Sequence, residues 1–318
     1  MPERREWPKV SIVTPSFQQA QFLEQTIRSV LDQRYPNLEY LVMDGGSTDG
    51  SVEVIQRHAR QLSYWVSEAD GGQADAVNKG WQRVQGDILA YLNSDDFYLP
   101  GAIHRAVDYF ERHPQTSIVY GSEQLVDAAS RPIGQPVQAP PCSIAWLLRH
   151  PLPQPTMFFR REAFERVGWL DPSLHYVFDW EWNLRAAVAG VVIDRLPGPP
   201  VAAFRCWEGQ KTAANFDKHI DEQMRMRDQL GAREDFPAAL AGALRFSKAW
   251  AFLWPAYQYY VQGRMREARR LLQRAVAVDW RMGAHPECLG MYVRSLLGQT
   301  LSGRARKIKT WLMREERC

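Results

Sequence analysis

The chain has 318 residues, of which 45% are hydrophobic and 24% are charged. This length and balance fit a folded globular protein with one sizeable core and an appended element, and they exclude a disordered or fibrous chain. The four cysteines, Cys142, Cys206, Cys288 and Cys318, form no Cys-x-x-Cys pair, so neither a zinc site nor a disulfide framework is predicted. The N-terminal MPERREWPKV contains no apolar stretch of signal-peptide length. These features favour a protein of the reducing cytoplasm.

Positive charge is concentrated near the C-terminus. The formal net charge is +3, and residues 236–318 hold 15 Lys and Arg against 5 Asp and Glu, or +10, which leaves −7 for residues 1–235. A basic end on an acidic body is typical of a protein that meets an anionic surface, either membrane lipid or nucleic acid. A solvated helical face explains the same charges equally well.

Five apolar runs predict buried parallel strands, at residues 10–14, 38–44, 64–67, 88–93 and 118–120. The segments between them have helical period. Two sets of apolar residues each share one helix face: Leu23, Ile27, Val30 and Leu31, and then Ile103, Ala106, Val107 and Phe110. This alternation predicts a three-layer α/β/α sandwich, in which the ligand site lies at the carboxyl ends of the strands.

The loops that follow the first four strands are polar and rich in glycine. They read TPSFQ (14–18), DGGSTDG (44–50), SEADGGQ (67–73) and NSDD (93–96). Plain turn geometry is the better interpretation of each Gly-Gly pair taken alone. Neither a phosphate-binding Gly-x-x-x-x-Gly-Lys-Ser/Thr loop nor a Gly-x-Gly-x-x-Gly motif follows the first strand, which disfavours P-loop and dinucleotide-binding proteins.

The fourth of these loops carries the adjacent carboxylates Asp95 and Asp96. Two acids at the end of a buried strand repel each other unless a divalent metal, a hydrogen-bond network or solvent separates them. Alone, Ser-Asp-Asp after a strand is more typical of a turn and helix cap. The other motifs of the chain favour a metal site.

Several ordered motifs together resemble the inverting family-2 glycosyltransferases of the GT-A fold: VSIVTPSF, YLVMDGGSTDGS, EADGGQADAVNKG, YLNSDDFYLPGAI, QPTMFFRREAFERVGWLD and HYVFDWEWNLRAA. The resemblance covers residues 9 to about 212. It implies a GT-A catalytic domain at residues 1–214 and a basic, aromatic-rich helical extension at 215–318. It also implies a nucleotide-sugar donor, with a UDP-sugar as the first expectation, a divalent metal ion (Mn²⁺ or Mg²⁺) and a single displacement at the anomeric carbon.

The same resemblance assigns roles to residues of the strand-end loops. Asp96 is expected to bind the metal directly, with Asp95 nearer the ribose or the water shell of the metal. The base pocket is expected to be lined by Pro15, Phe17 and Asp44, and core packing is the alternative for Phe17. Further donor contacts are expected from Asp70, Gln73, Asp75 and Asn78, and contacts to the diphosphate from Lys211 and Thr212.

Inversion needs a general base on the acceptor side of the sugar. Asp179, in FDWEW, is the candidate by resemblance, with Glu181 as the alternative. Asp179 also fits an ordinary helix N-cap. The neighbouring Trp180 and Trp182 are acceptor-side candidates that offer flat faces to a sugar ring, or else one of them is buried in the core.

Two positions depart from the family pattern. Many members have two acids after the second strand, whereas here Gly45 follows Asp44. In the stretch FRCWEGQKT, Trp207 stands where the family often carries a histidine that binds the metal or a phosphate. A third protein ligand to the metal is therefore in doubt.

The aromatic run at 249–261 is too short for a membrane span, because Arg245, Lys248 and Pro255 interrupt it. Such aromatics beside basic residues, with further cations from Arg304 to Arg317, fit peripheral contact with the inner face of the cytoplasmic membrane. Packing within a helical extension is the alternative.

Taken together, the resemblance implies a metal-dependent inverting glycosyltransferase that acts on a saccharide or lipid-linked acceptor, with cell-surface polysaccharide synthesis as the expected pathway. A protein of the same fold that binds nucleotide sugars without turnover is the alternative. No nucleic-acid partner is expected, because no base-reading motif accompanies the basic tail.

Overall fold

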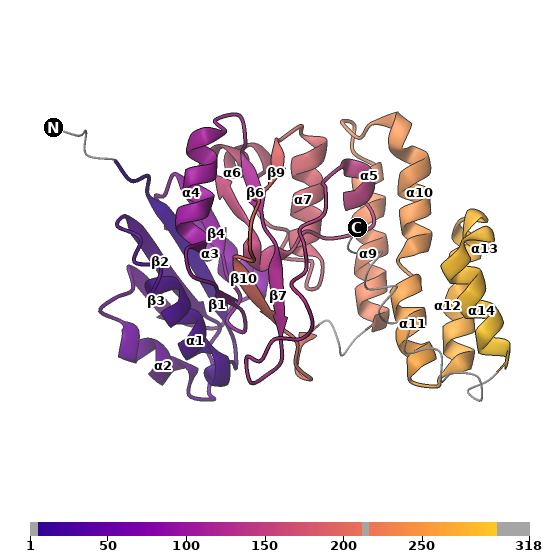
Figure 1. Ribbon diagram of the computed structural model, residues 1–318, viewed down its shortest axis with the longest axis horizontal. Helices are drawn as coiled ribbons and strands as arrows, with labels where there is room; N and C mark the ends of the chain where they lie inside the picture. Colours follow the sequence, from indigo (N-terminus) through magenta and orange to yellow (C-terminus); the bar gives the residue numbers. More distant parts are fainter. Residues whose placement is uncertain (1–5, 212–215, 298–318) are drawn as a thin grey trace. The chain divides into compact units, whose positions relative to one another are not determined.

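The computed structural model describes residues 6–211 and 216–297. The chain divides into two compact units, drawn in Figure 1. The first comprises Met1–Cys142 and Leu152–Gln210, and the second comprises Ser143–Pro151 and Lys211–Cys318. The first unit therefore ends close to the boundary expected at residue 214, whereas residues 143–151 group with the second unit.

A seven-stranded sheet forms the centre of the first unit. Its strand order is β3-β2-β1-β4-β8-β6-β9. The strands are β1 (Val10–Ser16), β2 (Leu38–Asp44), β3 (Tyr64–Ser67), β4 (Ile88–Tyr91), β6 (Ile118–Tyr120), β8 (Phe158–Arg160) and β9 (Ile193–Arg195). β1 to β4 are parallel, as predicted.

The fifth predicted strand, β6, is not hydrogen-bonded to β4, because β8 lies between them. It pairs antiparallel with β8 and parallel with β9. β8 has only three residues, and it lies between β4 and β6 in the sheet. Because β8 is antiparallel to both β4 and β6, β6 runs in the same direction as β1 to β4, as predicted, and β8 is the strand of opposite direction that the sequence did not reveal.

Helices cover both faces of this sheet. On one face, apolar residues of α1 (Ala20–Leu31), α2 (Ser51–His58) and α4 (Ala102–Arg112) share one core with β1, β2 and β4. On the other, Trp81 of α3 (Gln73–Trp81) packs against Phe164 of α6 (Arg161–Val167) and Trp182 of α7 (Phe178–Val188). Alternate strand residues point to opposite faces, so both faces of the buried strands must be apolar. The predicted three-layer α/β/α sandwich is confirmed.

A second, three-stranded sheet in the first unit has the order β5-β10-β7. Its strands are β5 (Phe97–Tyr98), β7 (Glu123–Val126) and β10 (Ala202–Arg205). β5 begins directly after the acid pair, and its Phe97 pairs with Ala203 of β10. This pairing brings the end of β10 to the two acids.

The second unit is helical. Its elements are α5 (Ile144–Leu147), α9 (Phe216–Gly231), the short 3-10 helix η2 (Ala238–Leu240), α10 (Ala241–Trp250), α11 (Leu253–Val261), α12 (Met265–Val278), α13 (Arg281–Ala284) and α14 (Pro286–Leu297). Phe252, Leu253 and Tyr260 of the aromatic run are buried in its own core. None of the helices in the described ranges is long and apolar enough to cross a membrane. The basic segment Arg304–Arg317 lies outside the described residues.

Candidate functional site

The carboxyl ends of the first four strands meet at one edge of the main sheet. Ser16 at the end of β1 lies opposite Asp44 of β2, and Asp44 lies opposite Ser67 of β3. The amide of Leu92, just after β4, donates to the carbonyl of Val13 at 2.9 Å. The polar loops that leave these strands therefore lie along one edge of the sheet, as the sequence predicted.

Asp44 organises the loop after β2. Its side chain is buried, and its Oδ2 accepts hydrogen bonds from the Ser47 amide at 2.8 Å and the Ser67 hydroxyl at 2.6 Å. The Gly46 amide adds a third bond to Oδ2 at 3.2 Å, and the Ser47 hydroxyl donates to Oδ1 at 2.6 Å. Oδ1 retains acceptor capacity, since a carboxylate oxygen accepts two bonds. The expected contact with a base stays a prediction.

Phe17, Gly45 and Asp70 come together from three different strand ends. A Cβ atom built on Gly45 would lie 3.2 Å from Cδ2 of Phe17 and 2.9 Å from Oδ2 of Asp70. Phe17 is 61% exposed, so the core-packing alternative for it is wrong. Pro15 is buried within β1. An exposed aromatic face beside an acid suits a planar group that carries N–H donors, such as a nucleotide base.

Burial raises the pKa of the Asp70 carboxyl, with smaller upward contributions from the charges of Asp75 and Asp44. Its Oδ1 accepts a bond from the Gly72 amide at 2.7 Å. Asp75 accepts from the Gly71 amide at 2.9 Å and pairs with Lys79 at 3.2 Å. These two acids fix the loop that precedes α3.

A chain of side-chain amides runs from α3 to β4. Gln73 Nε2 donates to Asn93 Oδ1 at 2.6 Å, and Asn93 Nδ2 donates to Gln154 Oε1 at 3.1 Å. Gln154 lies in the 3-10 helix η1 (Gln154–Thr156), and its Nε2 donates to the carbonyl of Tyr91 at 2.9 Å. Gln73 is thereby held next to the loop that carries the acid pair.

Asn78 has a structural task. Its Nδ2 donates to the Leu170 carbonyl at 2.9 Å, and its Oδ1 accepts from the Leu170 amide at 3.1 Å. The buried amide of Asn78 therefore anchors the loop that precedes α7 to the donor-side helix α3. The predicted contact between Asn78 and the nucleotide-sugar donor would have to replace these two hydrogen bonds.

Asp95 and Asp96 each accept one hydrogen bond from the segment at the end of β10. Trp207 Nε1 donates to Asp95 Oδ2 at 3.0 Å, and the Arg205 amide donates to Asp96 Oδ1 at 2.9 Å. Burial raises the pKa of both carboxyls, and the charge of Asp95 raises the pKa of Asp96 further. The pair is therefore costly to ionise until a cation neutralises it.

The buried side chain of Arg205 supports this pair from within the protein. Its Nε donates to the carbonyl of Asp95 at 2.7 Å, and its other nitrogens donate to Gln25 and to the loop at 127–130. The guanidinium also lies 4.4 Å from the ring centroid of Phe22. Sequence analysis missed Arg205, because a lone arginine after a short strand gives no signal of its task.

The acid pair fits a divalent cation. Asp96 is 1% exposed, and its Oδ2 has no hydrogen-bond partner among the described residues. Hard carboxylate oxygens of this kind are what Mg²⁺ and Mn²⁺ prefer. Within residues 6–211 and 216–297, no cluster of three or more His, Cys, Asp and Glu side chains could hold a metal ion. The described residues thus supply two carboxylates, those of Asp95 and Asp96, as ligands for the cation.

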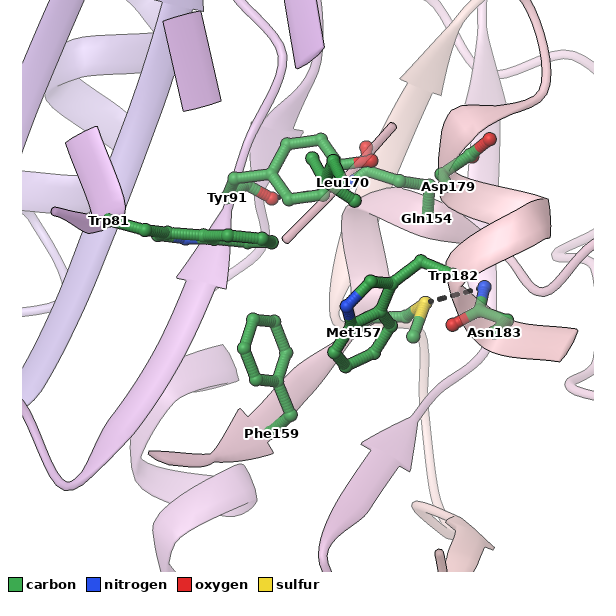
Figure 2. Close-up of a pocket in the computed structure, with 9 residues that line it drawn as sticks. All are labelled: Trp81, Tyr91, Gln154, Met157, Phe159, Leu170, Asp179, Trp182 and Asn183. Atoms are coloured by element: carbon green, nitrogen blue, oxygen red, sulfur yellow. Dashed lines mark hydrogen bonds between the residues drawn. The ribbon is translucent and has the colours of Figure 1, made fainter. Parts of the chain in front are cut away.

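Asp179 lies at a small, mostly apolar pocket that Tyr91 of β4 also lines. Figure 2 shows the rings of Trp81, Tyr91, Phe159 and Trp182 around this pocket and Asp179 on its α7 side. The remaining lining residues are Gln154, Met157, Leu170 and Asn183. Burial, and then the charges of Asp179 and Asp96, raise the pKa of the Tyr91 hydroxyl well above its usual value. The carboxylates of Asp179 and Asp96 are therefore both near enough to disfavour ionisation of the Tyr91 hydroxyl.

Asp179 is not the N-cap of α7. The N-cap residue is Val177, and Asp179 lies in the first turn, where its Oδ1 accepts from the Trp180 amide at 2.8 Å. The positive end of the helix dipole favours an ionised carboxylate at this position. Asp179 is half-buried. These features agree with a proton acceptor, and that role stays a prediction.

The acceptor-side expectations for the neighbours of Asp179 need correction. Trp180 and Trp182 are both buried, and Trp182 Nε1 donates to the Gly168 carbonyl at 2.8 Å. Trp180 therefore offers no open face to a sugar, and the ring of Trp182 faces only the small pocket beside Asp179. Arg185 donates to Glu181 Oε1 at 2.6 Å and to Oε2 at 2.9 Å. Because Arg185 binds both carboxylate oxygens of Glu181, Asp179 is favoured over Glu181 as the base.

The candidates for the diphosphate are not placed at the site. Lys211 is exposed and belongs to the second unit, and Thr212 lies outside the described residues. Their contacts to the diphosphate stay predictions.

Comparison with known proteins shows the family of the chain. The model of the family described as glycosyl transferase family 2 matches residues 11–168. An uncharacterized glycosyltransferase of Mycobacterium tuberculosis is 33% identical over 189 residues, which cover 57% of this chain and 70% of the relative. A putative teichuronic acid biosynthesis glycosyltransferase of Bacillus subtilis, TuaG, is 33% identical over 105 residues, or 32% of this chain and 42% of the relative.

Two solved structures have a similar fold. S. aureus TarS 1-349, in complex with UDP-GlcNAc, superposes with a TM-score of 0.63 at 14% identity, over 94% of this chain and 92% of that one. The mannosyltransferase PcManGT from Pyrobaculum calidifontis, in complex with GDP-Man and Mn²⁺, gives a TM-score of 0.61 at 18% identity, over 99% of this chain and 87% of that one. With its family match, its 33% identical relative and its GT-A fold, the chain belongs to glycosyl transferase family 2, and it is a glycosyltransferase.

Proposed function

We propose that the protein transfers a sugar from a nucleoside diphosphate donor to an acceptor hydroxyl, with inversion at the anomeric carbon. The observation that carries this proposal is the acid pair Asp95 and Asp96 just after β4, together with Asp179 at a pocket that Tyr91 of the same strand also lines. Phe17, Asp44 and Asp70 supply a nucleotide-base site at the same sheet edge. TarS holds UDP-GlcNAc, which supports a UDP-sugar as the first donor to test.

In the proposed reaction the acceptor oxygen forms a bond to the anomeric carbon while the bond from that carbon to the diphosphate oxygen breaks. The bonding electrons leave with the nucleoside diphosphate, and Asp179 accepts the proton of the acceptor hydroxyl. A divalent cation bound by Asp95 and Asp96 would neutralise the charge that grows on the leaving diphosphate. The complex of PcManGT with Mn²⁺ supports this choice of ion.

The first experiment is calorimetric binding of UDP, GDP, CDP and dTDP to the full chain, each with and without Mn²⁺. We expect one nucleotide to bind tightly and only with the ion. Asp96→Asn should abolish this binding, whereas the exposed Asp32→Asn should leave it unchanged. Equal nucleotide affinity in the wild type and Asp96→Asn would refute the metal assignment. Metal-dependent binding without turnover of any sugar would favour the alternative of a binding protein.

The acceptor is proposed to be a saccharide or a lipid-linked saccharide in cell-surface polysaccharide synthesis. The similarity to TuaG, a putative glycosyltransferase of teichuronic acid biosynthesis, supports this class. A lipid-linked acceptor would bring the protein to the inner face of the cytoplasmic membrane. In the second unit, Leu289, Val293 and Leu296 form an apolar stripe on α14 and are 50%, 45% and 61% exposed. Such a stripe, followed by a basic segment, suits contact with an anionic bilayer.

Sedimentation with vesicles tests this contact. The full chain should bind vesicles that contain anionic phosphatidylglycerol more strongly than neutral ones, and substitution of the three stripe residues by Ser should weaken the binding. Equal partition to anionic and neutral vesicles, or no binding to either, would refute it.

A further inference from the structure

Trp207 is held rigidly against the acid pair. Its Nε1 lies 3.0 Å from Asp95 Oδ2, and its ring packs edge-on to Phe22 at a centroid distance of 5.1 Å. A Cβ atom on Gly209 would lie 2.1 Å from Cζ3 of the indole, so the ring folds over its own loop where only glycine leaves it space. The position of the N–H group is therefore set by packing on two sides.

An indole N–H can only donate. Trp207 therefore holds one oxygen of Asp95 but cannot bind a metal ion itself. The backbone amide of Arg205 holds one oxygen of Asp96 in the same way, at 2.9 Å. Both acids are thus aimed by neutral donors from one strand end, and Asp96 Oδ2 is left without a partner in the described part of the chain.

The resulting cation site is incomplete. Ions such as Mg²⁺ demand octahedral coordination, with about six ligands, and two carboxylates supply only part of this set. No third acid, histidine or cysteine joins the pair within the described residues. The diphosphate of a bound nucleotide and water are the available sources of the remaining ligands.

We infer that Trp207 is a positioning residue that aims Asp95 and keeps the cation site incomplete, so that the cation and the nucleoside diphosphate bind only together. This inference rests on the proposed function. Because coupling between two ligands is reciprocal, the factor by which the nucleotide tightens Mn²⁺ binding must equal the factor by which Mn²⁺ tightens nucleotide binding. The indole of Trp207 therefore controls how strongly Mn²⁺ and the nucleotide promote the binding of each other.

The test measures free Mn²⁺ by electron paramagnetic resonance during titration of the full chain, first alone and then with saturating nucleotide. For the wild type we expect no saturation by Mn²⁺ alone up to about 1 mM, and at least about a tenfold gain in affinity with the nucleotide, in the usual range of coupling free energies. Micromolar binding of Mn²⁺ alone would overturn the inference without any variant.

Two variants of Trp207 distinguish the positioning of Asp95 from direct binding of the metal ion. Trp207→Phe keeps an aromatic ring on Phe22 and removes the donor, so Mn²⁺ affinity in the presence of nucleotide should fall about tenfold, as for other groups that orient a metal ligand. Trp207→His offers an imidazole nitrogen that can bind the ion, so Mn²⁺ should bind about tenfold more tightly without nucleotide. Trp280→Phe, at a 74% exposed position of the second unit, is the control.

The outcomes distinguish this inference from the proposed function. Unchanged Mn²⁺ affinity with nucleotide in a folded Trp207→Phe overturns only the role of Trp207. Nucleotide binding that is independent of Mn²⁺ in the wild type overturns the metal dependence itself. Absence of nucleotide binding under all conditions overturns the proposed function.

Discussion

Gly45 and Asp70 lie so close that any side chain at position 45 would have to displace the Asp70 carboxylate. A Cβ atom on Gly45 would lie 2.9 Å from Asp70 Oδ2, which is closer than real Cβ contacts come. Many members of the family have an acid at the position of Gly45. In this chain Asp70, from the loop after the next strand, places its carboxylate in the space that such an acid would occupy.

Gly45→Asp should therefore lower both stability and nucleotide affinity, because the new side chain collides with Asp70 and adds a like charge. Overpacking of this kind costs about 1–3 kcal/mol. The double variant Gly45→Asp with Asp70→Gly should recover much of the nucleotide affinity, which calorimetry would measure. Gly242→Asp is the control, since a Cβ there meets no atom within 4 Å. Additive losses in the double variant would contradict the shared space.

Asp179 and Glu181 offer a matched pair for the general base. Asp179→Asn should keep nucleotide binding and lose transfer by a factor of about 10²–10⁴, the usual contribution of a general base. Glu181→Gln should instead lower the melting temperature, because it breaks the ion pair with Arg185, and should retain transfer. Rates of sugar transfer and thermal shifts measure the two effects. The reverse pattern would make Glu181 the base.

The strands at the centre of the sheet could be predicted from the sequence because their burial on both faces leaves continuous apolar runs. Residues 38–44, for example, form β2 as expected. The loops that follow them could be predicted to meet, since the ends of parallel strands share an edge. β8 escaped prediction because only two of its three residues are apolar and it runs directly into α6 at Arg161, so no bounded apolar run marks it.

The side-chain contacts of the site could not be predicted, because they join positions far apart in the sequence. Trp207 meets Asp95 across 112 positions, and Asn78 meets Leu170 across 92. Trp180 and Trp182 flank Glu181 on α7, and their burial depends on which helix faces pack against the sheet. Each of these contacts depends on tertiary packing, which the local pattern of polar and apolar residues does not reveal.

Two buried tyrosines should respond differently to loss of their hydroxyl groups. The Tyr40 hydroxyl and Thr14 Oγ1 form a buried hydrogen bond of 3.0 Å. The Tyr91 hydroxyl is buried and has no hydrogen-bond partner in the described ranges. Tyr40→Phe should therefore lower the free energy of unfolding by about 1–3 kcal/mol, whereas Tyr91→Phe should leave it unchanged or raise it slightly. Chemical denaturation of both variants measures this, and an equal loss in Tyr91→Phe would contradict the prediction.

His150 makes the second unit sensitive to mild acid. Burial, and then the charges of Arg149 and Arg227, lower its pKa from 6.5 to about 4. Its ring also packs against Trp146 and Trp250. Because the unfolded chain binds a proton at higher pH than the folded one, stability is complete above pH 6.5 and is lost as the pH falls toward 4. The shift corresponds to at most about 3 kcal/mol.

Thermal unfolding between pH 7 and pH 4.5 tests this prediction. Glu24 of the first unit contributes little to the loss above pH 4.5: although burial raises its pKa, hydrogen bonds from His58, Arg57 and Arg28 outweigh this and lower it to about 2, so its contribution is lost between pH 4.5 and 2. His150→Gln should flatten the loss of melting temperature between pH 6.5 and 4.5, whereas substitution of the exposed His175 by Gln should not. Parallel curves for the wild type and His150→Gln would show that another group binds the destabilising proton.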